Sequence, residues 1–226
     1  MKKRVLAYLL AGILLVVGLV MIFNQPITNF LVKRMTQTSL QQSIQLKTKK
    51  RGEFDFKKVK SANASAIVKA SVAKQATGSI GKIAIPAVNL KLPIFYGISN
   101  SNLLRGAGTL KANQKMGSGN YALAGHHMND PNILFSPLAK AHVGEMVYLT
   151  DGHQVYRYRL TTRKTISKYQ VDVINDQPNK KMVTLITCDP IPGVATTPLS
   201  ILLQGTLQTV ENLNAKNHKL FESLLK

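Results

Sequence analysis

The only cysteine of the chain stands where a predicted strand must end. Residues 183–187 are β-branched or apolar, which favours a buried strand, and Cys188 follows them directly. Pro190 and Pro192 then stop the strand, because proline cannot donate to a β-ladder. A thiol at the mouth of a strand is rigidly held and can face a groove, as a nucleophile must, although a lone cysteine is also commonly a small buried hydrophobe. One cysteine excludes an intrachain disulfide and a cysteine-rich zinc site.

A thiol becomes a good nucleophile only beside a base or a cation, so the histidines matter next. His126 and His127 end a predicted strand just after a glycine, which is the same kind of position as that of Cys188. Two strand ends at one rim would bring Cys188 and His126 together, and such a pair suits acyl transfer. The reaction also needs a donor for the oxyanion. The other three histidines fall in segments that look solvated: His142, His153 and His218.

The positive charge of the chain is concentrated before these motifs. The formal net charge is +20, and residues 1–80 carry 14 Lys and Arg against 2 Asp and Glu, whereas residues 81–226 carry 16 against 8. This excess predicts an anionic surface as a partner, either a membrane or a wall polymer. The basic residues are not interleaved with aromatic ones, which argues against nucleic acid.

The N-terminus reads as a membrane segment. Residues 5–23 contain no charged side chain and would span about 28 Å as a helix, close to the thickness of a bilayer core. A cleaved signal peptide is the alternative, but no Ala-x-Ala-like site follows. We therefore predict that residues 1–25 are a cytoplasmic tip and an uncleaved, single-pass signal anchor. Lys2, Lys3 and Arg4 would keep the N-terminus in the cytoplasm and place the rest outside the cell membrane.

Two further regions follow the membrane segment. Residues 26–80 hold few large apolar residues and are predicted to be a basic extracellular stalk, with a short amphipathic helix at 36–46. Residues 81–226 contain short β-like runs separated by Gly, Pro and Asn. About eight such runs predict an all-β domain, either a closed barrel or a sandwich, with short helices and an amphipathic helix at 214–225.

Several runs together resemble the sortase family. Residues 184–188, Thr-Leu-Ile-Thr-Cys, resemble its Leu-x-Thr-Cys signature, and residues 102–109, 120–127 and 133–138 resemble the region of its catalytic histidine. The similarity runs from about Lys82 to Gln208 in the order of the family, and it is greatest to the housekeeping class A. The resemblance implies an eight-stranded closed β-barrel and a cysteine transpeptidase that uses no cofactor.

The resemblance also implies substrates and roles. In that family, the cysteine cleaves the Thr–Gly bond of a Leu-Pro-x-Thr-Gly signal on a surface protein, and an amine of a lipid-linked peptidoglycan precursor resolves the thioacyl intermediate. Cys188 would be the nucleophile and His126 the general acid and base. His127 would support the pair, and Thr187 would bind substrate or oxyanion. Residues 165–181 and 189–199 would border the groove.

One residue departs from the family pattern. The family has an arginine at the start of its last strand, and the matching position here is Ser200, which carries no charge. Arg105, Arg163 and Lys164 are candidate replacements. The missing arginine leaves open a protein of low or no turnover that binds sorting signals or wall polymer. A membrane-bound cysteine protease with water as acceptor is a further alternative.

The segment that binds calcium in some class A members also differs. Residues 110–120 contain Lys111 and Lys115 but no Asp or Glu. Calcium prefers clustered anionic oxygens. We therefore predict calcium independence and no metal site.

Overall fold

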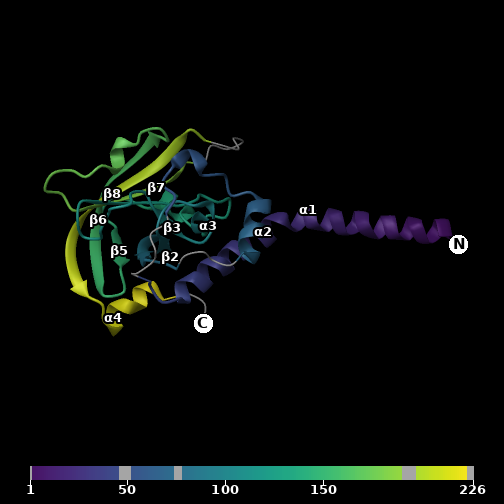
Figure 1. Ribbon diagram of the computed structural model, residues 1–226, viewed down its shortest axis with the longest axis horizontal. Coiled ribbons are helices and arrows are strands. Elements are labelled where there is room, and N and C mark those ends of the chain that lie inside the picture. Colours follow the sequence, from purple (N-terminus) through teal and green to yellow (C-terminus); the bar gives the residue numbers. More distant parts are fainter. Residues whose placement is uncertain (1, 46–51, 74–77, 190–196, 223–226) are drawn as a thin grey trace.

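The computed structural model describes residues 2–45, 52–73, 78–189 and 197–222. Within them the chain forms a closed barrel with the strand order β1-β2-β3-β4-β7-β8-β6-β5 (Figure 1). The eight-stranded closed barrel predicted from the resemblance is confirmed, and a sandwich is not formed. The strands are β1 (Gly81–Ile85), β2 (Leu90–Phe95), β3 (Ala107–Thr109), β4 (Asn120–Ala124), β5 (Met146–Thr150), β6 (Gln154–Ser167), β7 (Met182–Cys188) and β8 (Leu199–Asn212).

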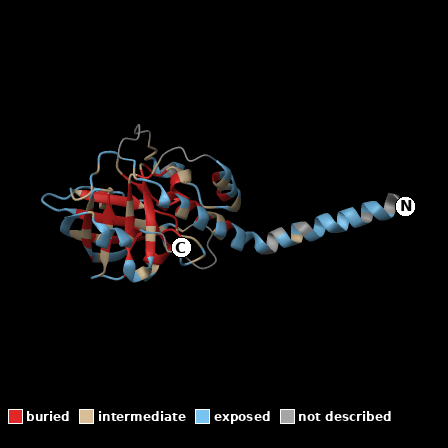
Figure 2. Ribbon diagram, turned by 90° about the horizontal axis from the view of Figure 1, so that it is seen from below, coloured by how far each residue is buried: buried red, intermediate tan, exposed pale blue. Residues whose placement is uncertain are grey.

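Alternation along the strands separates an inner from an outer face. On β7, Val183 and Leu185 are fully buried and belong to the central core, together with Tyr121 and Leu123 of β4. The residues between them point outward, because successive side chains of a strand alternate. The run at 183–187 therefore forms the buried strand that the sequence predicts, and Figure 2 shows strands of the barrel as the buried centre of the molecule.

The pairing of β4 with β7 positions the site. The two strands are parallel, and Ala124 lies opposite Ile186 at the end of the ladder. Both carboxyl ends therefore reach the same rim of the barrel. On its other side β7 pairs with β8 in antiparallel fashion, and β8 pairs with β6.

The N-terminal helix, α1 (Lys2–Gln41), is longer than the sequence predicts and contains Pro26. A proline inside a helix removes the bond to the carbonyl four residues earlier, here residue 22, and favours a kink. Within the described residues, no single helix meets the length and hydropathy requirements for crossing a membrane. The pair Arg4–Leu19 and Phe23–Gln41, bent by 57°, meets them jointly. The transmembrane helix stays a prediction.

The segment predicted as a stalk packs on the barrel. Val32 and Met35 of α1 are buried in the central core, as are Ile67 and Ala70 of α2 (Ala64–Val72). The few apolar residues of this region thus find their core on the barrel rather than in a unit of their own. Only the N-terminal half of α1 extends away and is exposed (Figures 1 and 2).

Arg105 fastens α2 to the barrel. Its side chain is buried, and Nη2 donates to the carbonyls of Ala70 at 2.6 Å and Ala73 at 3.2 Å, while Nη1 donates to the carbonyl of Ser101 at 3.1 Å. Carbonyls at the end of a helix lack partners within it, so the guanidinium satisfies them.

The remaining helices are short. The predicted helix at 214–225 is replaced, over its described residues, by two shorter pieces, and its Phe221 is buried against Ala84 and Val155. These short helices are η1 (Phe56–Lys58), η2 (Pro86–Val88), α3 (Asn100–Leu103), η3 (Ser136–Lys140), η4 (Asp172–Ile174), α4 (Ala215–His218) and η5 (Lys219–Phe221).

Candidate active site

His126 and Cys188 each lie two residues beyond the last pair of the parallel β4–β7 ladder. Ala124 of β4 lies opposite Ile186 of β7, and the N–H of Gly125 donates to the carbonyl of Ile186 at 3.2 Å. Counted two residues further, this register brings positions 126 and 188 to the same rim of the barrel. Cys188 falls on the outer face, because it lies two positions beyond the outward Ile186, and the same count predicts that face for His126. The pairing of these two residues as nucleophile and base stays a prediction.

Thr187 joins these two strand ends on the opposite face. It is buried, and its Oγ1 donates to the carbonyl of Gly125 at 2.9 Å. The hydroxyl group is thus occupied by the backbone that leads to His126. Its side chain points inward, whereas Cys188 points outward, so the structure places Thr187 to hold the pair in register rather than to face it.

His126 lies in a site that disfavours its charged form. Its side chain is 8% exposed, and its Nε2 is buried with no hydrogen-bond partner among the described residues. Burial lowers the pKa of His126 to about 4. The imidazole is therefore neutral at neutral pH and can accept a proton.

Cys188 shows the complementary effect. The residue is exposed, yet the surrounding protein removes enough water from the thiol that burial raises its pKa, and the positive charge of Lys168 opposes that rise in part. Burial raises the energy of a thiolate as it does that of an imidazolium. The resting pair consequently consists of a neutral thiol and a neutral imidazole.

His127 belongs to the other face of the strand. It pairs with Leu134 in an isolated bridge, and its Nδ1 is buried without a hydrogen-bond partner in the described part of the chain. Burial lowers the pKa of His127, and the negative charge of Asp189 opposes this effect. The Asp189 carboxylate accepts a hydrogen bond from Thr165 Oγ1 at 3.0 Å. His127 is thus placed with Asp189, away from the side chain of Cys188.

Ser200 lies directly across from Cys188. The two residues are paired in the antiparallel ladder of β7 and β8, so their side chains share the outer face. Ser200 is 5% exposed. The position aligned with the family arginine is therefore next to the thiol, as the sequence predicts, but only a hydroxyl group is present there.

The three candidate cations differ in their surroundings. Arg105 is bound to α2, and Arg163 Nη2 donates to the carbonyl of Ala139 at 3.0 Å. Lys164 lies opposite Leu202 on β8. The sequence missed Lys168, which directly follows β6 and acts on the thiol. Only the strand register relates position 168 to Cys188, so a sequence alone offers little signal for it.

An apolar surface continues from the pair along the outer face of β4 and β7. Ala124 and Ile186 are half-buried there, and Ile174 of η4 packs over the same cluster. The carbonyl of Val173 accepts hydrogen bonds from Asn120 Nδ2 at 3.1 Å and from Gln204 Nε2 at 3.2 Å, which fasten this segment to the barrel. Part of the segment expected to border the groove thus lies beside the pair. Of the other expected border, residues 190–196 lie outside the described residues.

Metal binding would require several His, Cys, Asp or Glu side chains to lie close together. Among the described residues, no group of three or more His, Cys, Asp or Glu side chains is arranged to hold a metal ion. Lys111, in the segment that carries carboxylates in calcium-binding sortases, forms an ion pair of 2.6 Å with Asp176.

Comparison with known proteins now gives the family. The sortase domain model matches residues 83–207. Sortase A of Listeria monocytogenes is 36% identical over 220 residues, covering 95% of this chain and 97% of that protein. Sortase A of Streptococcus agalactiae is 41% identical over 198 residues, covering 81% and 78%. The crystal structure of Listeria monocytogenes sortase A matches with a TM-score of 0.61 and 41% identity, over 64% of this chain and 98% of that one. The chain belongs to the sortase family and is a class A sortase, a cysteine transpeptidase.

Proposed function

We propose that Cys188 and His126 carry the transpeptidation by which this sortase anchors surface proteins. The observation that supports it most directly is the parallel pairing of β4 and β7, because the carboxyl ends of both strands, which lead to His126 and Cys188, lie at one rim of the barrel. The adjoining apolar surface suits an extended peptide with apolar residues, and we assign it to the Leu-Pro part of a Leu-Pro-x-Thr-Gly signal.

The first half of the reaction forms a thioester. Cys188 Sγ attacks the threonine carbonyl carbon while His126 takes the thiol proton, and the carbonyl oxygen becomes an oxyanion. The C–N bond to glycine then breaks, and the glycine amine leaves with the proton from His126. Since burial disfavours both charged partners, proton transfer must accompany or closely precede the attack.

The second half consumes the thioester. An amine of a peptidoglycan precursor attacks the same carbonyl carbon, and His126 accepts the proton that the amine loses. The C–S bond breaks, the new amide is released, and the proton returns to Cys188. In this scheme Thr187 is a positioning residue, because its bond to Gly125 fixes the spacing of the two strand ends.

Transpeptidation can be tested against the two alternatives. The full-length protein, kept in mild detergent, is incubated with a Leu-Pro-x-Thr-Gly peptide, with and without an amine nucleophile. We expect a ligated product that depends on the amine and disappears in Cys188→Ala. Peptide cleavage that does not depend on the amine would indicate a protease. Peptide binding without turnover would indicate a protein that only binds sorting signals. The relatives at 36–41% identity do not favour the binder.

We further propose that the N-terminal half of α1 is the signal anchor and that the basic residues near the barrel face an anionic membrane or wall polymer. The support is the row of exposed apolar side chains on this helix, which has no packing partner within the described chain: Val5, Leu6, Leu9, Leu10, Ile13, Leu14, Leu15 and Val17. Alkaline extraction of membranes tests it, since an anchored chain stays with the lipid and a peripheral one is released.

A further inference from the structure

We propose that the ammonium group of Lys168 supplies the positive charge that stabilises the Cys188 thiolate, in place of an arginine at position 200. The inference deepens the proposed function, because it takes Cys188 as the nucleophile. It concerns a residue that the family motifs do not include. It also answers the question raised by Ser200, which offers a hydroxyl group but no charge.

Strand register places Lys168 on the correct face. Cys188 of β7 lies opposite Ser200 of β8, and Ser200 lies opposite Ile166 of β6, so the three residues form one row across the outer surface. Lys168 is two residues beyond Ile166. Lys168 directly follows β6, and its backbone bond to Pro198 continues the pairing with the β8 side by one residue, so alternation places the lysine on the same surface as the thiol.

Backbone hydrogen bonds hold both ends of this arrangement. The N–H of Lys168 donates to the carbonyl of Pro198 at 2.8 Å, and the N–H of Asp189 donates to the carbonyl of Leu199 at 3.0 Å. Consecutive residues of one segment therefore fasten the chain on both sides. The flexible part of the arrangement is the lysine side chain, whose four methylene groups allow the ammonium to reach toward the thiol.

The charge of Lys168 is available. No carboxylate in the described ranges forms an ion pair with it, and its Nζ lies 5.2 Å from the centroid of the Tyr169 ring. Asp189 is bound to Thr165, a residue of the opposite face. The effect of Lys168 on the thiol, which lowers the pKa of Cys188 against burial, agrees with this placement.

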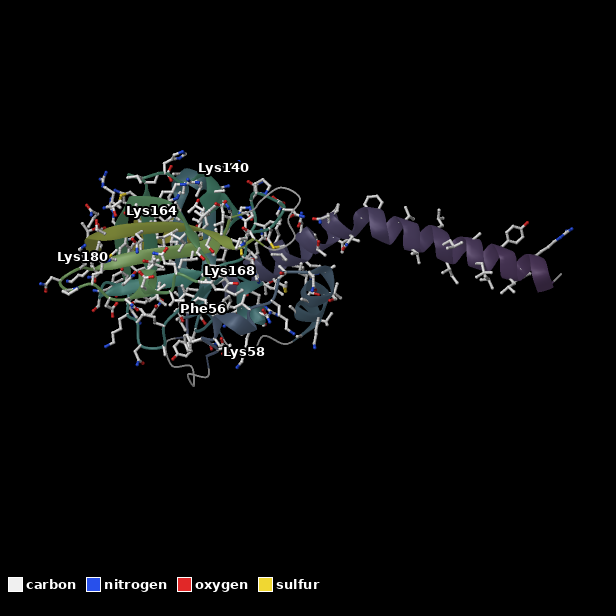
Figure 3. The ribbon with its side chains drawn as sticks, turned by 90° about the horizontal axis from the view of Figure 1, so that it is seen from above. Phe56, Lys58, Lys140, Lys164, Lys168 and Lys180 are labelled. Atoms are coloured by element: carbon white, nitrogen blue, oxygen red, sulfur yellow. The ribbon has the colours of Figure 1, made fainter. Side chains whose placement is uncertain are left out.

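Lys164 provides a matched control. It lies on β6, two residues before Ile166 and on the same face as that residue, and it is exposed like Lys168, which directly follows the strand. The two lysines lie apart on the barrel surface in Figure 3. Lys164 is not among the groups that shift the pKa of Cys188. Removing either lysine changes the net charge equally, so only the local effect differs.

The test measures the thiol directly. The rate of Cys188 alkylation by iodoacetamide is followed over a pH series in the full-length protein and in Lys168→Ala, Lys168→Arg and Lys164→Ala. We expect Lys168→Ala to move the midpoint to higher pH and to slow alkylation at neutral pH about threefold to tenfold. Lys168→Arg and Lys164→Ala should keep the original midpoint. An unchanged midpoint in a Lys168→Ala protein with unaltered thermal unfolding would overturn the proposal.

A second variant connects the charge to catalysis. Ser200→Arg, added to Lys168→Ala, should restore both the alkylation midpoint and the rate of ligation, because it returns a cation across from Cys188. Restoration of neither would contradict the proposal. Alkylation does not require Cys188 to be the nucleophile, so a failure of the proposed function would show only in the ligation assay.

Discussion

The two neighbours of the Cys188 strand contribute to the site in different ways. On the β4 side, the buried His126 lies two residues beyond the parallel partner strand, and Thr187 donates to the carbonyl of the preceding residue, Gly125. On the β8 side, the antiparallel partner carries a buried serine, and the positive charge proposed to act on the thiol is that of Lys168, which directly follows β6. Proton transfer requires contact, so its residue must be adjacent. A charge acts over a longer distance, so another strand can supply it.

The largest effect on the ligation rate should come from a substitution of His126, on the β4 side of Cys188. His126→Ala removes the proton acceptor, and we expect ligation to fall by about 10²–10⁴-fold, measured as kcat/KM for the sorting peptide. His127→Ala is the matched control, because its side chain is placed on the opposite face with Asp189. A similar loss of ligation in both variants would contradict the assignment of different roles to His126 and His127.

On the β8 side, adding a positive charge at position 200 should change the ligation rate more than removing the serine hydroxyl group. Ser200→Arg places a guanidinium directly across from Cys188, and we expect ligation to rise about tenfold, part of what an oxyanion donor contributes in other enzymes. Ser200→Ala, which removes only the hydroxyl group, should change the rate little. An unchanged or lower rate in a Ser200→Arg protein that unfolds at the wild-type temperature would show that the position does not correspond to the family arginine.

Burial of His126 should also appear in the pH dependence of stability. The folded pKa is about 4 and the ordinary value is 6.5, so the unfolded chain takes up a proton first as the pH falls. The stability that this histidine contributes is complete above pH 6.5 and is lost as the pH falls to about 4, a change of about 3 kcal/mol. Denaturant unfolding at several pH values should show that the free energy of unfolding falls more steeply with decreasing pH in the wild type than in His126→Asn. Parallel curves would indicate that the imidazole is hydrated.

Calcium should have the smallest effect. Lys111, in the segment where some sortases gather carboxylates, forms an ion pair with Asp176, and residues 110–120 contain no Asp or Glu that could hold calcium. We expect the same ligation rate with added calcium and with a chelator. Stimulation by calcium would show that a bound calcium ion also affects the active site, in addition to the β4 and β8 sides.

The strands that lead to His126 and Cys188 could be predicted from the sequence, because their signals are local. A β-branched run that ends at Cys188 and a strand that ends at His126 can be recognised from neighbouring residues, and the family motifs reinforce both. Lys168 could not be found in this way, because the pairing of β6 with β8, including its register shifts, decides where position 168 lies. The direction of Thr187 likewise depends on which face of β7 is buried.

The region before the barrel was also only partly predictable. Low apolar content at 26–80 led to the prediction of a stalk without a core of its own. It could not show that Val32 and Ile67 are buried in the core of the barrel, since that depends on contacts between distant parts of the chain. The sequence also did not predict that α1 extends past Pro26 to Gln41.

The hydrogen bonds of Arg105 help to set the distance between the apolar half of α1 and the barrel. Because Arg105 bonds α2 to the barrel and Val32 of α1 is buried in the barrel core, the chain between the apolar half of α1 and the barrel is packed rather than extended where the structure describes it. With the apolar half of α1 held in a membrane, Cys188 would work at one height above the lipid surface. A surface protein would then be processed only if its own spacer brings the sorting signal to that height, so the length of that spacer would select substrates as its sequence does.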